Sequence, residues 1–142
     1  TATRSLSVEG ARLSRTVRPG STLVCCIGAT IGKVDAAREI VAFNQQINAI
    51  EWGDAVDDTY GLFALRTLKP TIVSRGASTT LPLLPKSKFA GLEIPLPALA
   101  DQRRFAELAG LVGRKAGAMN SQIELASELY KSLRARAFSG RL

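Results

Sequence analysis

Histidine is absent from the sequence, and cysteine is rare. The 142 residues include two cysteines, one methionine and one tryptophan. Without histidine the chain cannot form a His-based catalytic triad, and zinc sites of the usual kinds are excluded as well. Cys25 and Cys26 are adjacent, and neighbours in a strand point to opposite faces, so a disulfide between them is not expected. We expect free thiols in a reducing, cytoplasmic setting.

Long apolar runs are also missing. No stretch approaches the roughly 18 consecutive apolar residues that a membrane-spanning helix needs. The chain does not open with a charged segment followed by an apolar one, which is the pattern of a secretory leader. We therefore expect no membrane association.

Sequence motifs of catalysis are missing too. The chain contains no tetrapeptide of the DPPY or NPPF kind, which would mark an amino-methyltransferase. Residues 28–33 resemble a phosphate loop, but the glycine spacing is one residue short and Val34 replaces the required Ser or Thr. A tight turn between two strands accounts for these glycines. Asp54, Asp57 and Asp58 lack the Gly and Glu of a calcium loop. We expect no catalytic residue, no metal site and no cofactor.

A basic excess is the first positive feature. Lys and Arg outnumber Asp and Glu by 19 to 12, which gives a net charge of +7 and a pI near 10.0. Basic proteins favour polyanions, and nucleic acid is the leading candidate. Because the charges are dispersed rather than clustered in a run, a merely solvated basic surface is an equally good interpretation.

Several short segments of the first hundred residues have strand character. Apolar or alternating stretches predict strands at residues 22–27, 44–50 and 92–97. Residues 59–68 are apolar with aromatics, and periodicity does not decide between a helix and a strand. Lys69 and Pro70 are expected to end that element, and residues 74–80 to form a polar loop that contains Arg75.

Polar residues of these segments are candidates for DNA contacts. Amides and Arg can read base edges, whereas Lys and hydroxyl groups hold phosphates. The candidate DNA-binding residues are Lys33, Arg75, Ser78, Thr79, Thr80, Lys86 and Lys88. The amides of Asn44, Gln45 and Gln46 either read bases or tie loops to the backbone, and the structural role is favoured because most side-chain hydrogen bonds go to the backbone.

An unbroken heptad pattern fills the last third of the chain. Steps of four and three give an apolar residue at every position, and no proline interrupts them. The seam consists of Phe105, Ala109, Val112, Ala116, Met119, Ile123, Ala126, Tyr130, Leu133 and Ala137. Such a narrow stripe is buried only by a partner helix. At 1.5 Å per residue the helix would be about 60 Å long, so we predict a spacer or dimerising arm.

Together these features predict an α+β protein in two parts. Residues 1–97 are expected to form a small, β-rich domain with a mixed or antiparallel sheet. Residues 98–142 are expected to form one long coiled-coil helix.

Several segments resemble a known family. Residues 19–24 and 27–33 are similar to a conserved stretch in the target recognition domains of the DNA-specificity subunits of type I restriction-modification systems. Residues 43–47 are similar to a second motif of these domains. Further matches are residues 79–82, 86–89, 94–97 and 133–142, with Asp101 and Gln102 at the position where the family usually has Glu-Gln. The resemblance covers essentially the whole chain in order.

The resemblance implies a sequence-specific, non-catalytic DNA-binding subunit. Residues 1–97 would be a recognition domain that reads half of a bipartite site in double-stranded DNA, although this domain is expected to lack its N-terminal part. The helix would pair with a second copy, or with the helix of a second recognition domain, and would dock the methyltransferase and restriction subunits. Two alternatives stay open: a coiled-coil adaptor, or a truncated remnant that does not bind DNA. An enzyme with an unrecognised site is a third class, for which the sequence offers no residues.

Overall fold

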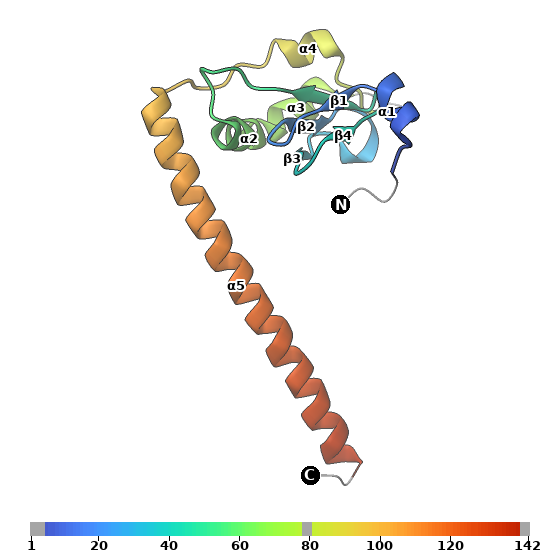
Figure 1. Cartoon of the computed structure of the whole chain (residues 1–142), viewed down its shortest axis with the longest axis vertical. Coiled ribbons are helices and arrows are strands. Elements are labelled where there is room, and N and C mark those ends of the chain that lie inside the picture. The colour runs from blue at the N-terminus through green and yellow to red at the C-terminus, as the bar shows by residue number, and fades with distance from the viewer. Residues whose placement is uncertain (1–4, 78–80, 140–142) are drawn as a thin grey trace. The chain divides into compact units, whose positions relative to one another are not determined.

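The chain consists of two compact units, which we describe separately. A computed structural model describes residues 5–77 and 81–139 (Figure 1). Unit 1 spans Thr1–Arg103 and contains all the described strands together with the described short helices. Unit 2 spans Arg104–Leu142, and its described residues belong to the body and end of one long helix.

All the described strands of unit 1 pair in antiparallel fashion. Strand β1 (Thr16–Val17) pairs with β4 (Val41–Ala42). A second sheet has the order β3-β2-β5 and contains β3 (Val34–Ala36), β2 (Thr22–Cys25) and β5 (Ile47–Ile50). The α+β class expected from the sequence is confirmed, with the antiparallel rather than the mixed arrangement.

The glycine-rich segment after β2 is a tight turn, as predicted. A short 3-10 helix, η1 (Gly28–Thr30), connects β2 to β3, and Gly28 and Gly32 have φ of +79° and +81°. These left-handed conformations favour glycine because it has no Cβ. The Gly32 N–H donates to the Cys25 carbonyl at 2.9 Å, which closes the turn. This geometry, rather than phosphate binding, explains the two glycines.

The undecided apolar segment is a helix, α2 (Asp58–Thr67). Asp57 caps it, since its Oδ1 accepts hydrogen bonds from the backbone N–H groups of Thr59 and Tyr60 at 2.9 and 3.0 Å. Such a cap satisfies N–H groups that have no partner within the helix. The cap sits at the end of the acidic stretch that the sequence analysis considered as a metal site.

The element at residues 59–68 ends before Lys69 and Pro70, as expected, but two other expectations about the following segments are wrong. Lys69 and Pro70 begin a second helix, α3 (Lys69–Arg75), in whose first turn the missing N–H of proline is tolerated. The expected polar loop therefore begins after Arg75. Residues 92–97 form no strand, because prolines at positions 95 and 97 supply no N–H for a ladder. Two further short helices are α1 (Val8–Leu13) and α4 (Lys86–Ala90).

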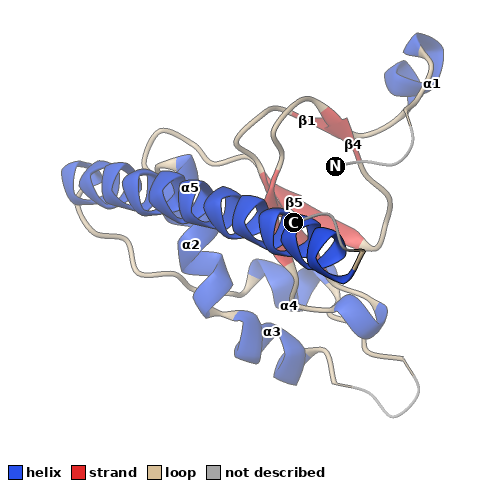
Figure 2. Cartoon of the chain, turned by 90° about the horizontal axis from the view of Figure 1, so that it is seen from below, coloured by secondary structure: helices blue, strands red, loops and turns tan. Residues whose placement is uncertain are grey.

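The core lies between the three-stranded sheet and the helices α2 and α3, which run along one side of the strands (Figure 2). Its buried residues are Val24, Cys26, Ile31, Val34, Leu62, Leu65, Ile72, Leu84 and Phe89. Val24 and Ile72 are fully buried, and burial of a side chain of this size stabilises the fold by about 1.5–3 kcal/mol.

Gly61 leaves room for the indole of Trp52, which packs against this core. The indole Nε1 donates to Thr22 Oγ1 at 2.9 Å, and a Cβ added to Gly61 would overlap the indole ring. A glycine inside a helix costs about 1 kcal/mol relative to alanine. In α2 this cost is offset by close packing of the large indole against the helix backbone.

The long helix α5 runs without interruption from Leu99 to Phe138 and has 40 residues. This confirms the long C-terminal helix predicted from the heptad pattern. Within the part of the chain that the structure covers, no helix has both the length and the apolar character needed to cross a membrane.

Candidate nucleic-acid interface

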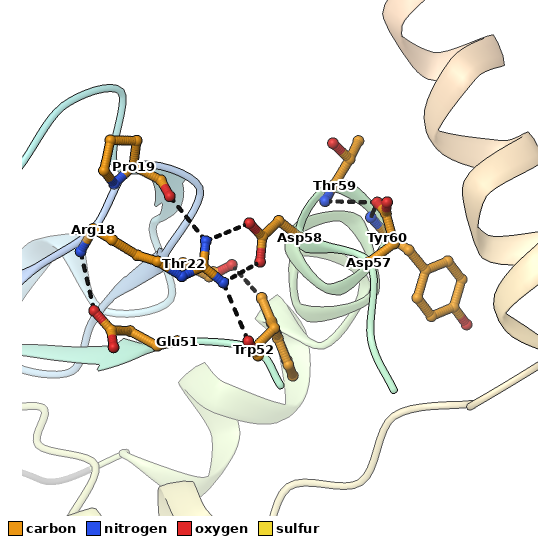
Figure 3. A network of polar contacts seen from close by, with 9 residues as sticks. All are labelled: Arg18, Pro19, Thr22, Glu51, Trp52, Asp57, Asp58, Thr59 and Tyr60. Carbon is orange, nitrogen blue, oxygen red and sulfur yellow. Dashed lines mark hydrogen bonds and ion pairs between the residues drawn. The ribbon is translucent and has the colours of Figure 1, made fainter. Parts of the chain in front are cut away.

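Several arginines of unit 1 form ion pairs or hydrogen bonds with other residues of the chain, and Arg18 is the clearest case (Figure 3). Its Nη1 and Nη2 donate to the two carboxylate oxygens of Asp58 at 2.6 and 2.9 Å. The same guanidinium donates to the carbonyls of Pro19 and Trp52, and the Arg18 backbone N–H donates to Glu51 Oε1. The hydrogen bond to Asp58 raises the pKa of Arg18, so the guanidinium stays protonated and the Asp58 carboxylate compensates its charge. The pair ties the β1–β2 turn to the start of α2.

Arg66 is also engaged within unit 1. It lies 3.4 Å from Asp35 Oδ1 and 5.2 Å from the centroid of the Phe63 ring. The predicted base-reading residue, Arg75, ends α3, and its Nη1 donates to the Gly91 carbonyl at 3.1 Å. Its side chain is exposed, so one N–H group has a structural role while the rest of the guanidinium faces solvent.

The other predicted DNA-binding residues are distributed over the unit. Lys33 is exposed directly before β3, and Lys86 and Lys88 are exposed on α4. Ser78, Thr79 and Thr80 lie outside the described residues. Because side chains two positions apart on a helix do not share a face, Lys86 and Lys88 point in different directions.

A polar cleft brings Lys86 together with residues from distant parts of the sequence. Its volume is about 510 Å³, and it is lined by Arg15, Phe43, Asn44, Gln45, Ile47, Asn48, Ala49 and Lys86. None of these lining residues is acidic. Lys33, Arg75 and Lys88 do not line it. Arg15, which the sequence analysis did not single out, reaches this place because it directly precedes β1, and β1 pairs with β4 just before Phe43.

Of the three amides considered from the sequence, Asn44 and Gln45 line the polar cleft and Gln46 does not, while Asn48 is a further lining amide. Asn44 Oδ1 accepts a hydrogen bond from the Gln46 backbone N–H at 3.1 Å, which shapes the turn before β5. Asn48 Nδ2 donates to Cys26 Sγ at 3.0 Å. Gln45 is exposed on the cleft, and the hydrogen bonds found among the described residues do not involve its side chain. The structural role favoured from sequence therefore fits Asn44, whereas Gln45 is available to a ligand.

An apolar cleft of about 310 Å³ adjoins the polar one. The two share Asn48, Ala49 and Lys86, while Trp52 and Phe89 are among the other residues of the apolar cleft. Its lining belongs largely to the edge of the hydrophobic core. It offers few hydrogen-bonding groups to a nucleic acid.

The thiol of Cys26 is shielded from solvent. The residue is buried, and burial raises the pKa of its thiol, although the hydrogen bond from Asn48 acts in the opposite direction. Both cysteines are free. A protonated, buried thiol is a poor nucleophile, so Cys26 does not support a catalytic role.

A buried amide holds the first turn of α5 within unit 1. Gln102 is only 1% exposed. Its Oε1 accepts from the Asp57 N–H at 2.9 Å, and its Nε2 donates to the carbonyls of Ala55 and Pro97 at 3.0 and 2.9 Å. Sequence similarity pointed to Asp101 and Gln102 as a motif, but gave Gln102 no role. The structure shows that it connects the start of α5 to the loop at residues 55–57 and to Pro97.

In unit 2 the predicted seam is uncovered. Apart from the half-buried Ala109, every seam residue is exposed, and Met119 at its middle is 63% exposed. Four leucines outside the seam are exposed as well, at 50–66%: Leu108, Leu111, Leu125 and Leu129. An apolar surface of this extent on one helix is typical of an interaction site.

Comparison with known proteins gives consistent matches. A family model described as the type I restriction modification DNA specificity domain, Methylase_S, matches residues 11–109. The specificity subunit of the type I restriction enzyme MjaVIII from Methanocaldococcus jannaschii is 22% identical over 123 residues, which make up 87% of this chain and 29% of that subunit.

Solved structures of similar fold agree with these matches. A chain from a study of complex assembly and conformational transition in the type I R-M system aligns with a TM-score of 0.69 and 25% identity, covering 90% of this chain and 33% of the other. The HsdS subunit from Thermoanaerobacter tengcongensis aligns with a TM-score of 0.60 and 23% identity, covering 89% and 31%. This chain therefore spans about a third of the length of these relatives.

Proposed function

Because a match over residues 11–109 covers more than half of the chain, the chain belongs to the type I restriction modification DNA specificity family, and we propose that it recognises DNA within such a system. In this proposal unit 1 is a recognition domain that contacts half of a bipartite site in double-stranded DNA. The family match is the single observation that carries the proposal.

The charge distribution supports contact with DNA. Arg18 and Arg66 are paired with carboxylates, but Lys33, Lys86 and Lys88 are exposed, and no ion pair involves them among the described residues. Free cations of this kind bind phosphates and release counterions. Arg75 retains exposed N–H groups that can contact a base edge or a phosphate.

The exposed seam of α5 supports pairing with another helix. We propose that α5 packs antiparallel against the helix of a second copy or of a second recognition domain. Alanines occupy four of the ten seam positions, at 109, 116, 126 and 137, so the two backbones can approach closely. A rigid helical pair would then set the distance between the two half-sites.

We further propose that the chain itself is non-catalytic and acts with partner subunits. The methyltransferase subunit would supply the chemistry on adenine, and the restriction subunit the cleavage, with the specificity subunit as their platform. We expect the complex to act in the cytoplasm, with the DNA that it modifies.

Co-expression with the methyltransferase subunit tests the proposal. The chain and the methyltransferase subunit encoded beside it are expected to co-purify, and the host DNA is expected to carry modified adenine at one bipartite motif. Omission of the chain is the control and should abolish the motif. Failure of two folded partners to form a complex would refute the proposal.

A coiled-coil adaptor without DNA binding is the second candidate, favoured by the uncovered seam. An adaptor would form the complex, yet the complex would bind no duplex even at low salt. Salt-dependent binding of duplex DNA by the complex would exclude this alternative.

A further inference from the structure

The polar cleft beside β5 has the composition of a site for a nucleic-acid backbone. Two cations, Arg15 and Lys86, line it together with the exposed amide of Gln45, and no carboxylate does. We propose that one strand of the DNA lies in this cleft, with Arg15 and Lys86 on phosphates and the Gln45 amide donating to a phosphate or sugar oxygen. This inference rests on the proposed function, because that function supplies DNA as the ligand.

The availability of Arg15 and Lys86 distinguishes them from the arginines of unit 1 that the protein itself engages. Arg18 and Arg66 lie against Asp58 and Asp35, and Arg75 donates to the Gly91 carbonyl. By contrast, Arg15 and Lys86 are exposed and have no carboxylate within ion-pairing distance among the described residues. A phosphate in the cleft would therefore meet two uncompensated charges.

The lining amides divide into those that build the cleft and one that faces it. Asn44 holds the turn through the Gln46 N–H, and Asn48 is directed to Cys26 Sγ. These two hydrogen bonds hold the turn and β5 in place, and so they fix the backbone that carries Gln45. Phosphate and sugar oxygens accept half to two-thirds of protein hydrogen bonds to DNA, from Arg, Lys and amide side chains among others.

The cleft is assembled by pairings between segments that are distant in sequence. Arg15 is positioned by the pairing of β1 with β4, Gln45 by the turn into β5, and Lys86 by the start of α4. Because the antiparallel ladders and the core hold these elements, the cations do not have to be gathered when DNA binds. Preorganisation of this kind reduces the entropy cost of binding.

Charge-removing variants of similar length test the cleft, since they preserve packing: Arg15→Gln, Lys86→Gln, and the two combined. The probe is a fluorescein-labelled duplex pool of randomised sequence, and the complex with the methyltransferase subunit is titrated at several salt concentrations. Each single variant is expected to make the negative slope of log K against log salt shallower by about 0.9, and the double variant by about 1.8. At 0.1 M salt each loss corresponds to roughly eightfold weaker binding.

Gln45→Ala provides an independent readout. It removes an uncharged group, so binding should weaken about two- to tenfold while the salt slope stays unchanged. The motif enriched from the pool by selection should also remain that of the wild type, because a backbone contact does not read the base. A changed motif would assign Gln45 to a base edge and overturn the proposed backbone role.

Arg38→Gln is the matched control, because Arg38 is exposed but does not line the cleft. Its affinity is expected to stay within about twofold of the wild type. If the wild-type complex binds DNA but the cleft variants retain its slope, or the control loses as much as they do, the cleft proposal is wrong and the proposed function stands. If the wild-type complex binds no DNA, the proposed function itself is wrong.

Discussion

Replacement of Gln102 by leucine should destabilise unit 1, because the side chain is buried and uses its amide in three hydrogen bonds. Leucine has a similar size but neither donates nor accepts. The backbone N–H of Asp57 and the carbonyls of Ala55 and Pro97 would lose their partner. Each net hydrogen bond contributes about 0.5–1.5 kcal/mol, and additional apolar burial by leucine offsets part of the loss. We expect a decrease of about 1–3 kcal/mol in the free energy of unfolding.

Urea unfolding followed by tryptophan fluorescence measures this effect. Trp52 is the only tryptophan of the chain, and its indole lies against the core of unit 1, so its emission reports on that unit. Gln122→Leu is the matched control, because Gln122 is an exposed glutamine of the same helix. The control should change stability by less than about 0.5 kcal/mol. A Gln102→Leu variant as stable as the control would refute the reasoning.

Further predictions concern packing, the seam and the thiols. Gly61→Ala should lower the unfolding temperature, because its Cβ would overlap the indole of Trp52, and overpacking costs about 1–3 kcal/mol against a helix-propensity gain of about 1 kcal/mol; a raised temperature would contradict the packing. Met119→Lys should shift the free chain from dimer toward monomer, because it places a charge at the middle of the apolar seam, and light scattering measures this shift. A wild-type chain that stays monomeric at high micromolar concentration would exclude self-association. An alkylating reagent should label Cys25 before Cys26 in the folded chain, as mass spectrometry would show, because burial raises the pKa of the Cys26 thiol. That raised pKa also predicts that stability falls as the pH rises above about 9, because the thiol of the unfolded chain loses its proton first. A stability that does not change with pH in this range would contradict the burial effect.

Local patterns were sufficient for part of the fold. The heptad spacing predicted α5 because it repeats over many turns, and the paired glycines at 28 and 32 predicted the turn because few other residues adopt their backbone angles. The structure of residues 59–68 could not be decided from the sequence, because their apolar residues follow neither the helical period nor the alternation of a strand. Asp57 was a usable signal for a helix N-cap, but it was considered only as a possible metal ligand.

The polar cleft could not be predicted from local sequence patterns. Arg15 becomes part of it only through the pairing of β1 with β4, which joins segments more than twenty residues apart. Likewise, no local pattern indicates that Arg18 is neutralised by Asp58, forty positions along the chain. Charge counts treat every cation alike, whereas the fold decides which of them are available to a ligand.

The connection made by Gln102 has a consequence for the design of chimeras of this chain. The fold of unit 1 ends at Arg103, inside the first turns of α5, rather than where the helix begins at Leu99. A chimera joined before the helix would pair one domain's loop at residues 55–57 with another protein's Gln102 equivalent. A crossover after Arg103 would transfer the buried amide together with the backbone groups that it bonds. A domain transferred together with the start of its helix therefore keeps all three hydrogen bonds of Gln102.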